Sequence, residues 1–360
     1  MAPRWRIRPE SLYSANGRKP GPFGCADGFG RKTCSIFQRF PLGVATTPIS
    51  NRRRHPFSPG PLSLTNYQHG RRHNVSIFRY PGSKTKLIAA IMRHFPTSHQ
   101  FPLWSSLDCL EYREPFFGAG VFGLWLMENV LHSRCPIWIN DIDPGMAAAW
   151  KAVHESPFEL IRHIQAFTPS VEAFYEFKKS DGQSCGSDAE DGFRKIALHR
   201  MSVSGFGAMS GGPIGGRTQL SSGYTVDCRW TPSRIKRDII QVHRVMKRFR
   251  SLRITCEDFR EMTETAHDRC FLYLDPPYYK KGSQLYKFNM SPNDHDSLSE
   301  TLAKSPAQWV LSYDDHSEIR RLYSWATFHE MYVTYSNAVC RESKRPKNRE
   351  VVIVPISEAA

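Results

Sequence analysis

The stretch Cys270–Tyr279 reads CFLYLDPPYY and opens with five apolar residues in a row. An unbroken apolar run of this length is typical of a parallel strand that is buried on both faces of a sheet. The run ends abruptly in Asp275, two prolines and two tyrosines. Because ligands bind at the carboxyl ends of the strands in open α/β sheets, we predict a central strand over Cys270–Leu274 with a functional site directly after it.

The residues that follow this strand suit a planar ligand that carries an amino group. Asp275 offers carboxylate acceptors, Pro276 and Pro277 lack backbone donors and leave carbonyl acceptors unopposed, and Tyr278 adds an aromatic face. If Asp275 and the Pro276 carbonyl each accepted one N–H of a nucleobase amine, the nitrogen would pyramidalise and direct its lone pair at an electrophile. An isolated Asp-Pro is more often a tight turn, but all four residues behind a buried strand favour a site.

This Asp-Pro-Pro-Tyr sequence resembles motif IV of the amino-methyltransferases that act on the exocyclic amine of adenine. The resemblance implies that the four residues are catalytic, with Asp275 and the Pro276 carbonyl orienting the amine and Tyr278 stacking on the base. The reaction it implies moves a methyl group from S-adenosylmethionine to the N(6) amine of an adenine that has flipped out of the duplex.

A glycine-rich segment lies earlier in the chain. Gly118–Gly123 reads GAGVFG, a G-x-G-x-x-G pattern in which glycines allow close backbone approach, and Asp141 follows at the spacing of a ribose-binding acid. These residues alone also fit a nicotinamide-dependent dehydrogenase. With the preceding Glu114-Pro115-Phe116, the segment is similar to the EPFxGxG donor loop of the adenine methyltransferases. That likeness implies contacts to S-adenosylmethionine from Phe117, Gly118, Gly120 and Asp141.

Two other stretches resemble cofactor-binding motifs of the same family. The likeness of RYPGSK implies that Tyr80 and Lys84 lie at the methionine end of the donor. The likeness of the second stretch implies that Asp258 and Phe259 contact the donor adenine. Each has a simpler explanation, because Lys84 also fits a solvated surface lysine and the second pair fits a helix cap beside a core aromatic. For Asp143 we expect only an N-cap, to the helix Pro144–His154.

Residues 155–253 break the alternation of strands and helices and are predicted to form a mainly helical insertion that recognises DNA. Ser204–Arg217 holds six glycines in fourteen residues and is expected to be irregular. Ser233–Phe249 is expected to be a helix with one apolar stripe and an otherwise basic surface, which suits phosphate contact. The run resembles the phage-type subgroup of Dam-like enzymes. We predict DNA contacts from the following residues: Arg217, Gln219, Arg237, Arg244 and Lys247.

Composition limits the remaining possibilities. The formal net charge is +15, but residues 1–73 contain 13 Lys or Arg and two acids, so most of the basicity lies there. We predict that these residues form a disordered basic tail. They also fit a transit peptide or a nonspecific DNA-binding arm, and a further alternative is that the natural chain starts near Val75. The nine cysteines include no CxxC pair. We therefore expect no metal site, no disulfide framework and a reducing cytoplasm.

The motifs that resemble the Dam-like DNA adenine methyltransferases span residues 76–356. They imply an α/β fold with a Rossmann-like, seven-stranded methyltransferase sheet, whose catalytic domain comprises residues 74–154 and 254–360. We expect a cytoplasmic monomer without membrane spans, S-adenosylmethionine as cofactor, double-stranded DNA as substrate and a cognate restriction endonuclease as a candidate partner. The alternatives are an RNA adenine methyltransferase and a DNA-binding relative without catalysis.

Overall fold

The computed structural model describes residues 77–79, 87–94, 111–220, 223–280, 282–333 and 348–356. All of them belong to one compact unit, Pro59–Ala360. The predicted tail over residues 1–73 lies outside the described residues, as do the two predicted donor contacts Tyr80 and Lys84. Within the described ranges, no helix combines the length and the apolar character that crossing a membrane requires.

Seven strands form one sheet in the order β3-β2-β1-β4-β5-β7-β6. The first five strands in this order run parallel, and β7 is antiparallel to both β5 and β6. This confirms the predicted seven-stranded α/β sheet. The strands are β1 Glu111–Glu114, β2 Ile137–Asn140, β3 Leu252–Thr255, β4 Cys270–Leu274, β5 Gln308–Asp314, β6 Thr327–Val333 and β7 Asn348–Val354.

The central strand β4 coincides with the predicted strand, and its side chains divide between two hydrophobic cores. Phe271 and Tyr273 belong to one core, whereas Cys270, Leu272 and Leu274 belong to the other. Successive side chains of a strand point to opposite faces, so a strand covered on both faces must be apolar at every position. This explains why β4 shows no alternation between apolar and polar residues.

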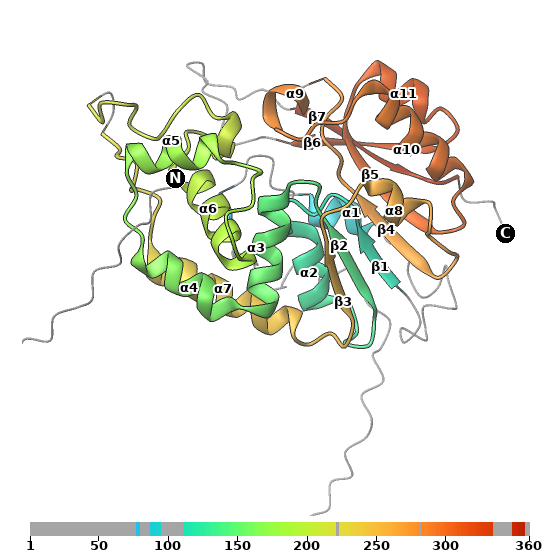
Figure 1. Ribbon diagram of the computed structural model, residues 1–360. Coiled ribbons are helices and arrows are strands. Elements are labelled where there is room, and N and C mark those ends of the chain that lie inside the picture. The colour runs from blue at the N-terminus through green and yellow to red at the C-terminus, as the bar shows by residue number, and fades with distance from the viewer. Residues whose placement is uncertain are drawn as a thin grey trace, which may run out of the picture. The chain divides into compact units, whose positions relative to one another are not determined.

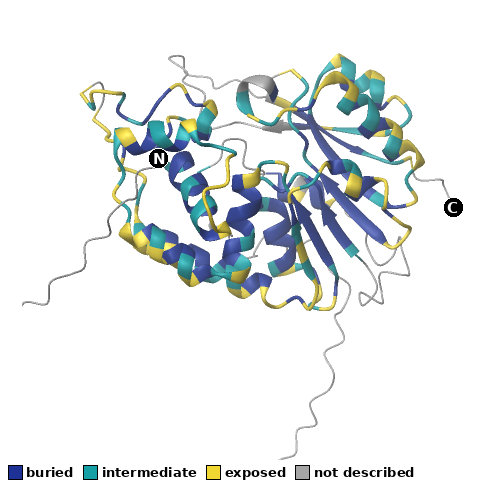
Figure 2. Ribbon diagram, in the orientation of Figure 1, coloured by how far each residue is buried: buried dark blue, intermediate teal, exposed yellow. Residues whose placement is uncertain are grey.

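Helices cover both faces of the sheet (Figure 1). α2, α3 and α7 supply residues to the core on one face, and α8, α10 and α11 supply the core on the other. Figure 2 shows the strands between them as a buried layer. The helices are α1 Ile88–Met92, α2 Val121–Asn129, α3 Pro144–Glu155, α4 Pro157–Ala166, α5 Val171–Lys179, α6 Asp188–Met201, α7 Pro232–Met246, α8 Phe259–Thr263, α9 Gly282–Leu285, α10 Pro292–Lys304 and α11 Ser317–Leu322.

The segment over residues 155–253 is mainly helical, as its pattern predicted, and contains α4 to α7 with a short 3-10 turn at Gly207–Met209. α7 buries the predicted apolar stripe, which includes Ile235, Ile239 and Val242, in the core beside the sheet. It then leads into β3, which pairs in parallel with β2. Parallel neighbours need a long crossover connection, so α7 forms part of the sheet's covering layer. The predicted domain boundaries stay predictions.

α6 packs against α3 at very close range, and glycine makes this possible. A Cβ atom at Gly192 of α6 would lie 2.5 Å from the Cα and 2.8 Å from the backbone nitrogen of Ala149 in α3. Neither backbone atom can move without shifting its helix. The contact therefore sets how closely the insertion approaches the helix that follows β2.

Replacing Gly192 by alanine is expected to lower the free energy of unfolding by about 1–2 kcal/mol. The clash of overpacking costs roughly 1–3 kcal/mol, which outweighs the gain of about 1 kcal/mol in helix propensity. Urea unfolding measures the difference. Gly211→Ala is the matched control, because a Cβ there meets no atom within 4 Å; equal stability of the two variants would contradict the close contact.

Candidate active site

A cleft opens where the carboxyl ends of β1 and β4 meet, and these strands are neighbours at the point where the strand order reverses. Its volume is about 1100 Å³, part of which is open to solvent. The walls come from the glycine loop after β1, the turn after β4 and the helical insertion. The predicted site residues that line it are Phe117, Gly118, Gly120, Asp141, Asp275, Pro277 and Tyr278.

The glycine loop presents its backbone to the cleft. Gly118 and Gly120 have φ angles of +49° and +68°, which L side chains rarely adopt. A Cβ at Gly118 would meet nothing within 4 Å, whereas one at Gly120 would lie 2.7 Å from the Phe117 ring. Gly118 therefore leaves room for a ligand beside the main chain, and Gly120 lets Phe117 fold under the loop.

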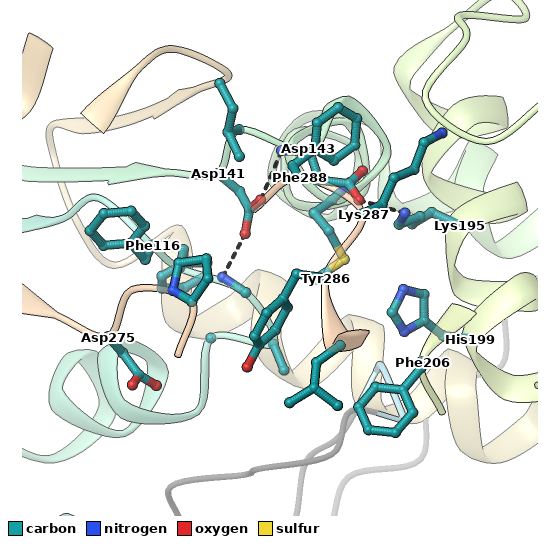
Figure 3. A pocket seen from close by; sticks show the side chains of 18 of the residues that line it. Phe116, Asp141, Asp143, Lys195, His199, Phe206, Asp275, Tyr286, Lys287 and Phe288 are labelled. Atoms are coloured by element: carbon teal, nitrogen blue, oxygen red, sulfur yellow. Dashed lines mark hydrogen bonds and ion pairs between the residues drawn. The ribbon is translucent and has the colours of Figure 1, made fainter. Parts of the chain in front are cut away.

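Asp141 is held at the tip of β2 by two backbone donors (Figure 3). The Gly118 N–H donates to Oδ2 at 2.8 Å and the Asp143 N–H donates to Oδ1 at 2.9 Å. Burial, and then the nearby carboxylate of Asp143, raise the pKa of Asp141 to about 7. Beside it, Ile142 is an apolar side chain left 45% exposed in the cleft wall. A recessed carboxylate next to an apolar surface fits the ribose and base of an adenosine.

Glu114 lies at the end of β1, behind the glycine loop, and also lines the cleft. It is buried, and the Tyr112 hydroxyl donates a hydrogen bond of 2.6 Å to its Oε2 atom. Burial raises the pKa of Glu114, and the charge of Asp275 raises it further. A Cβ at Gly123 would lie 2.1 Å from Oε2, so the glycine makes room for this carboxyl group.

The turn after β4 is fixed by the two strands that follow it in the sheet. The Ser312 hydroxyl of β5 donates to Asp275 Oδ1 at 2.8 Å. The Tyr278 hydroxyl donates to Oε1 of Glu350, a buried residue of β7, at 2.9 Å. Pro276 is not among the residues that line the cleft. The sequence carried no signal for Ser312 and Glu350, because they are distant in the chain and belong to no short motif.

The opposite wall comes from the insertion and from the loop after α9 (Figure 3). α6 contributes Lys195 and His199, and the loop Ser204–Arg217 of the insertion contributes Phe206. Burial lowers the pKa of His199 to about 3, so this imidazole is neutral. Tyr286 and Lys287 line the cleft from the loop after α9. Lys195, His199 and Phe206 were missed because nothing in the sequence relates the insertion to the glycine loop.

Asp258 and Phe259 lie outside the cleft. Asp258 is the N-cap of α8, accepts the Arg260 N–H at 2.9 Å and pairs with the Arg260 guanidinium at 3.0 Å. Phe259 is buried, with its ring centroid 5.5 Å from that of Phe116, which does line the cleft. Both positions match the simpler explanation of a cap and a core aromatic. Their proposed contact with the donor adenine stays a prediction.

None of the predicted DNA-binding residues lines the cleft. Arg217 stacks on the Tyr175 ring at 4.8 Å. The side-chain amide of Gln219 is engaged by its own loop: it donates to the carbonyls of Ile214 and Gly216 and accepts the Val226 N–H. This bonding gives Gln219 a structural role, and reading a base would break it.

The three basic residues predicted on α7 are exposed. Arg237 lies 3.5 Å from the buried carboxylate of Asp238, which offsets part of the basic charge. Arg244 and Lys247 lie near the carboxyl end of the helix. DNA contact by Arg217, Gln219 and this basic surface stays a prediction.

Asp143 has the capping role expected of it, and His295 is a buried packing residue. The Asp143 carboxylate caps α3 by accepting the N–H groups of Gly145 and Met146. His295 is buried, and its Nδ1 atom lies 2.7 Å from the Tyr313 hydroxyl. Burial lowers its pKa to about 4.

One group of side chains with metal-binding atoms occurs among the described residues: Glu111, His267 and Cys270. It lies at the amino ends of β1 and β4, away from the cleft. Arg113 pairs with Glu111 at 2.9 Å, so a cation already neutralises the carboxylate. The five cysteines in the described ranges are free thiols.

A family model described as D12 class N6 adenine-specific DNA methyltransferase matches residues 80–337, more than half of the chain. The chain belongs to this family. A search of curated proteins gives no match. As a D12-class enzyme, the protein is a methyltransferase that acts on the N6 amine of adenine in DNA. The match includes the glycine loop, the insertion and Asp275, and it does not favour the dehydrogenase that the glycine spacing alone left open.

Tyr112→Phe is expected to destabilise this methyltransferase by about 1–3 kcal/mol, because Glu114 would lose its donor while remaining buried. Chemical unfolding gives the difference. Tyr323→Phe is the control, since the Tyr323 hydroxyl is buried with no hydrogen-bond partner among the described residues; we expect it to be neutral or stabilising. Similar losses in both variants would show that the Tyr112–Glu114 bond contributes little.

Proposed function

We propose that the protein uses S-adenosylmethionine as its methyl donor and that Asp275 orients the amine of a flipped adenine toward it. The observation that carries this proposal is that the glycine loop and Asp275 line one cleft. A donor held at one strand end and an acceptor held at the neighbouring strand end meet without any change of fold. We further propose a cytoplasmic monomer that acts on double-stranded DNA, with a cognate restriction endonuclease as a candidate partner.

In this proposal the donor lies along the glycine loop. Asp141 accepts hydrogen bonds from the ribose hydroxyls, and Ile142 packs on the adenine. The open backbone at Gly118 allows the donor to approach the main chain closely. The Phe117 ring supports the loop from below, since it lies under Gly120. When bound, the donor supplies a methyl group made electrophilic by its sulfonium. The acidic side chains of Asp141 and Asp275 at the cleft favour a cation of this kind.

The acceptor lies at the turn after β4. Asp275, which lines the cleft, accepts one N–H of the adenine amine and so frees the nitrogen lone pair, and the Pro276 carbonyl as acceptor of the other N–H stays a prediction. Tyr278 stacks on the base, and its hydroxyl is anchored by Glu350. The nitrogen forms its bond to the methyl carbon as the carbon–sulfur bond breaks, and it then loses its surplus proton to solvent. Catalysis rests mainly on this positioning.

Asp275→Ala is expected to lower the rate of methyl transfer by roughly 10²–10⁴-fold, because the amine loses its orienting acceptor. Incorporation of labelled methyl groups into DNA measures the rate, and mass spectrometry of the nucleosides identifies N6-methyladenine. Calorimetry with S-adenosylhomocysteine measures the donor site, whose affinity should change only a few-fold.

The control for this variant is Asp268→Ala, which removes an exposed carboxylate two residues before β4. It should retain both transfer and binding. If Asp275→Ala loses binding as completely as transfer, Asp275 is a structural residue and its catalytic assignment is wrong.

Donor affinity is expected to rise with pH from about 6 to 8. The pKa of Asp141 is raised to about 7, so the carboxylate that accepts ribose hydroxyls is lost by protonation below that pH. Each unit below the pKa weakens binding about tenfold. Titrations with S-adenosylhomocysteine across this range measure the slope, and Asp141→Asn should bind weakly with no such dependence. A flat profile in the unmodified protein would exclude Asp141 as the ribose acceptor.

A further inference from the structure

A single buried cation lies between two acids from different parts of the chain. The Lys195 Nζ atom of α6 is 2.5 Å from the Asp143 carboxylate, which follows β2, and 2.8 Å from that of Asp181, between α5 and α6. The side chains of Lys195, Asp143 and Asp181 are 4%, 14% and 3% exposed. A lysine is rarely buried unless its charge is paired, so these contacts fix where the ammonium group lies.

The backbone of α3 is shaped to admit this lysine. A Cβ at Gly145, in the first turn of α3, would lie 2.9 Å from Cδ of Lys195. Gly192, three residues before Lys195, gives the close approach of α6 to α3. Because glycine occupies both positions, the lysine stem passes between the helices and reaches the cap of α3.

Asp143 connects this ion pair to the donor acid. One oxygen of its side chain caps α3, while the other pairs with Lys195. Its backbone N–H donates to Oδ1 of Asp141 at 2.9 Å. Figure 3 shows the resulting chain of contacts from Lys195 through Asp143 to Asp141. Any tilt of Asp143 that follows loss of Lys195 moves a donor on which the orientation of Asp141 depends.

We propose that Lys195 is a positioning residue for the cofactor: it acts through Asp143 to keep Asp141 ionised and correctly oriented for the ribose. This inference rests on the proposed role of Asp141 in binding the donor. It gives the insertion a function in the donor site in addition to any contact with DNA.

Asp181 also contacts the loop after α9, which borders the cleft. Lys287, in the loop after α9, lies 3.6 Å from the Asp181 carboxylate and donates a hydrogen bond to the Asp181 carbonyl. Asp181 is therefore shared between Lys195 and a cation of that loop. The donor acid, the insertion and this loop are linked by one series of ionic contacts.

The charges around Asp141 determine the effect of removing the lysine. Asp143 raises the pKa of Asp141 and Lys195 lowers it. The Cys256 thiol, after β3, also faces Asp141, and burial raises its pKa so that it stays neutral. Asp181 and Lys287 lie on the far side of Lys195. Without the ammonium group, the Asp143 carboxylate beside Asp141 loses the cation that is paired with it, and Asp141 retains its proton to higher pH.

The test measures binding of S-adenosylhomocysteine to Lys195→Met by calorimetry between pH 6 and pH 9. We expect the midpoint of the affinity–pH curve to move up by about one unit, which weakens binding about fivefold at pH 7. Lys195→Gln, which keeps a polar group in the site, should move the midpoint in the same direction. Thermal unfolding with and without the ligand gives an independent measure of binding to the folded protein.

Arg194→Met is the matched control. Arg194 is the neighbouring residue on α6 and is paired with Glu176 and Glu190 at 3.8 and 3.9 Å, both within the insertion. Losing these pairs should leave the affinity and the midpoint unchanged. A purely structural role of Lys195 would lower the melting temperature while the midpoint stays where it is, and that result would overturn the inference.

Asp141→Asn separates this inference from the proposed function. If Asp141→Asn leaves the affinity unchanged, the assignment of Asp141 fails, and the role of Lys195 fails with it. If Asp141→Asn weakens binding but the two Lys195 variants bind with the affinity and midpoint of the unmodified protein, only the role of Lys195 is wrong.

Discussion

The parallel pairing of β1 with β4 is the constraint on which the rest of the molecule depends. Their register, with Tyr112 opposite Phe271, brings the glycine loop and Asp275 to the same edge of the sheet. β2 and β3 lie on one side of β1 in the sheet, and β4 and β5 lie on the other side, so the strand order reverses between β1 and β4. The described helices α2 and α10, which follow β1 and β4 in the chain, pack on opposite faces of the sheet, and a cleft forms at the ends of these two strands.

Acidic side chains gather at this edge, and the fold controls their charge by different means. Glu114 is buried behind the loop with a single hydroxyl donor, so its pKa is raised. Asp141 accepts hydrogen bonds from two backbone donors, and its pKa of about 7 leaves it partly ionised at neutral pH. Asp275 is held by Ser312 at the rim of the cleft. Burial is thus the main cause that raises the pKa values of both Glu114 and Asp141.

The insertion has structural roles besides its predicted contact with DNA. α7 returns the chain to β3 and covers one face of the sheet, while α6 places Lys195 against the cap of α3. A helical segment whose sequence shows no link to the donor loop therefore forms one wall of the cleft. The glycines at 145 and 192 allow this, since larger residues would hold the two helices apart.

The sequence alone predicted the seven-stranded sheet and the two motifs whose residues line the cleft. An unbroken apolar run identifies β4 because it must satisfy two cores, and the short motifs around Gly118 and Asp275 are local, so each carries its own signal. Only the tertiary structure decided that Ser312 and Glu350 hold the turn after β4, that Gln219 binds its own loop and that Lys195 meets Asp143. These contacts join residues far apart in the chain. Their energies depend on burial and on distances of a few ångströms, which no local pattern encodes.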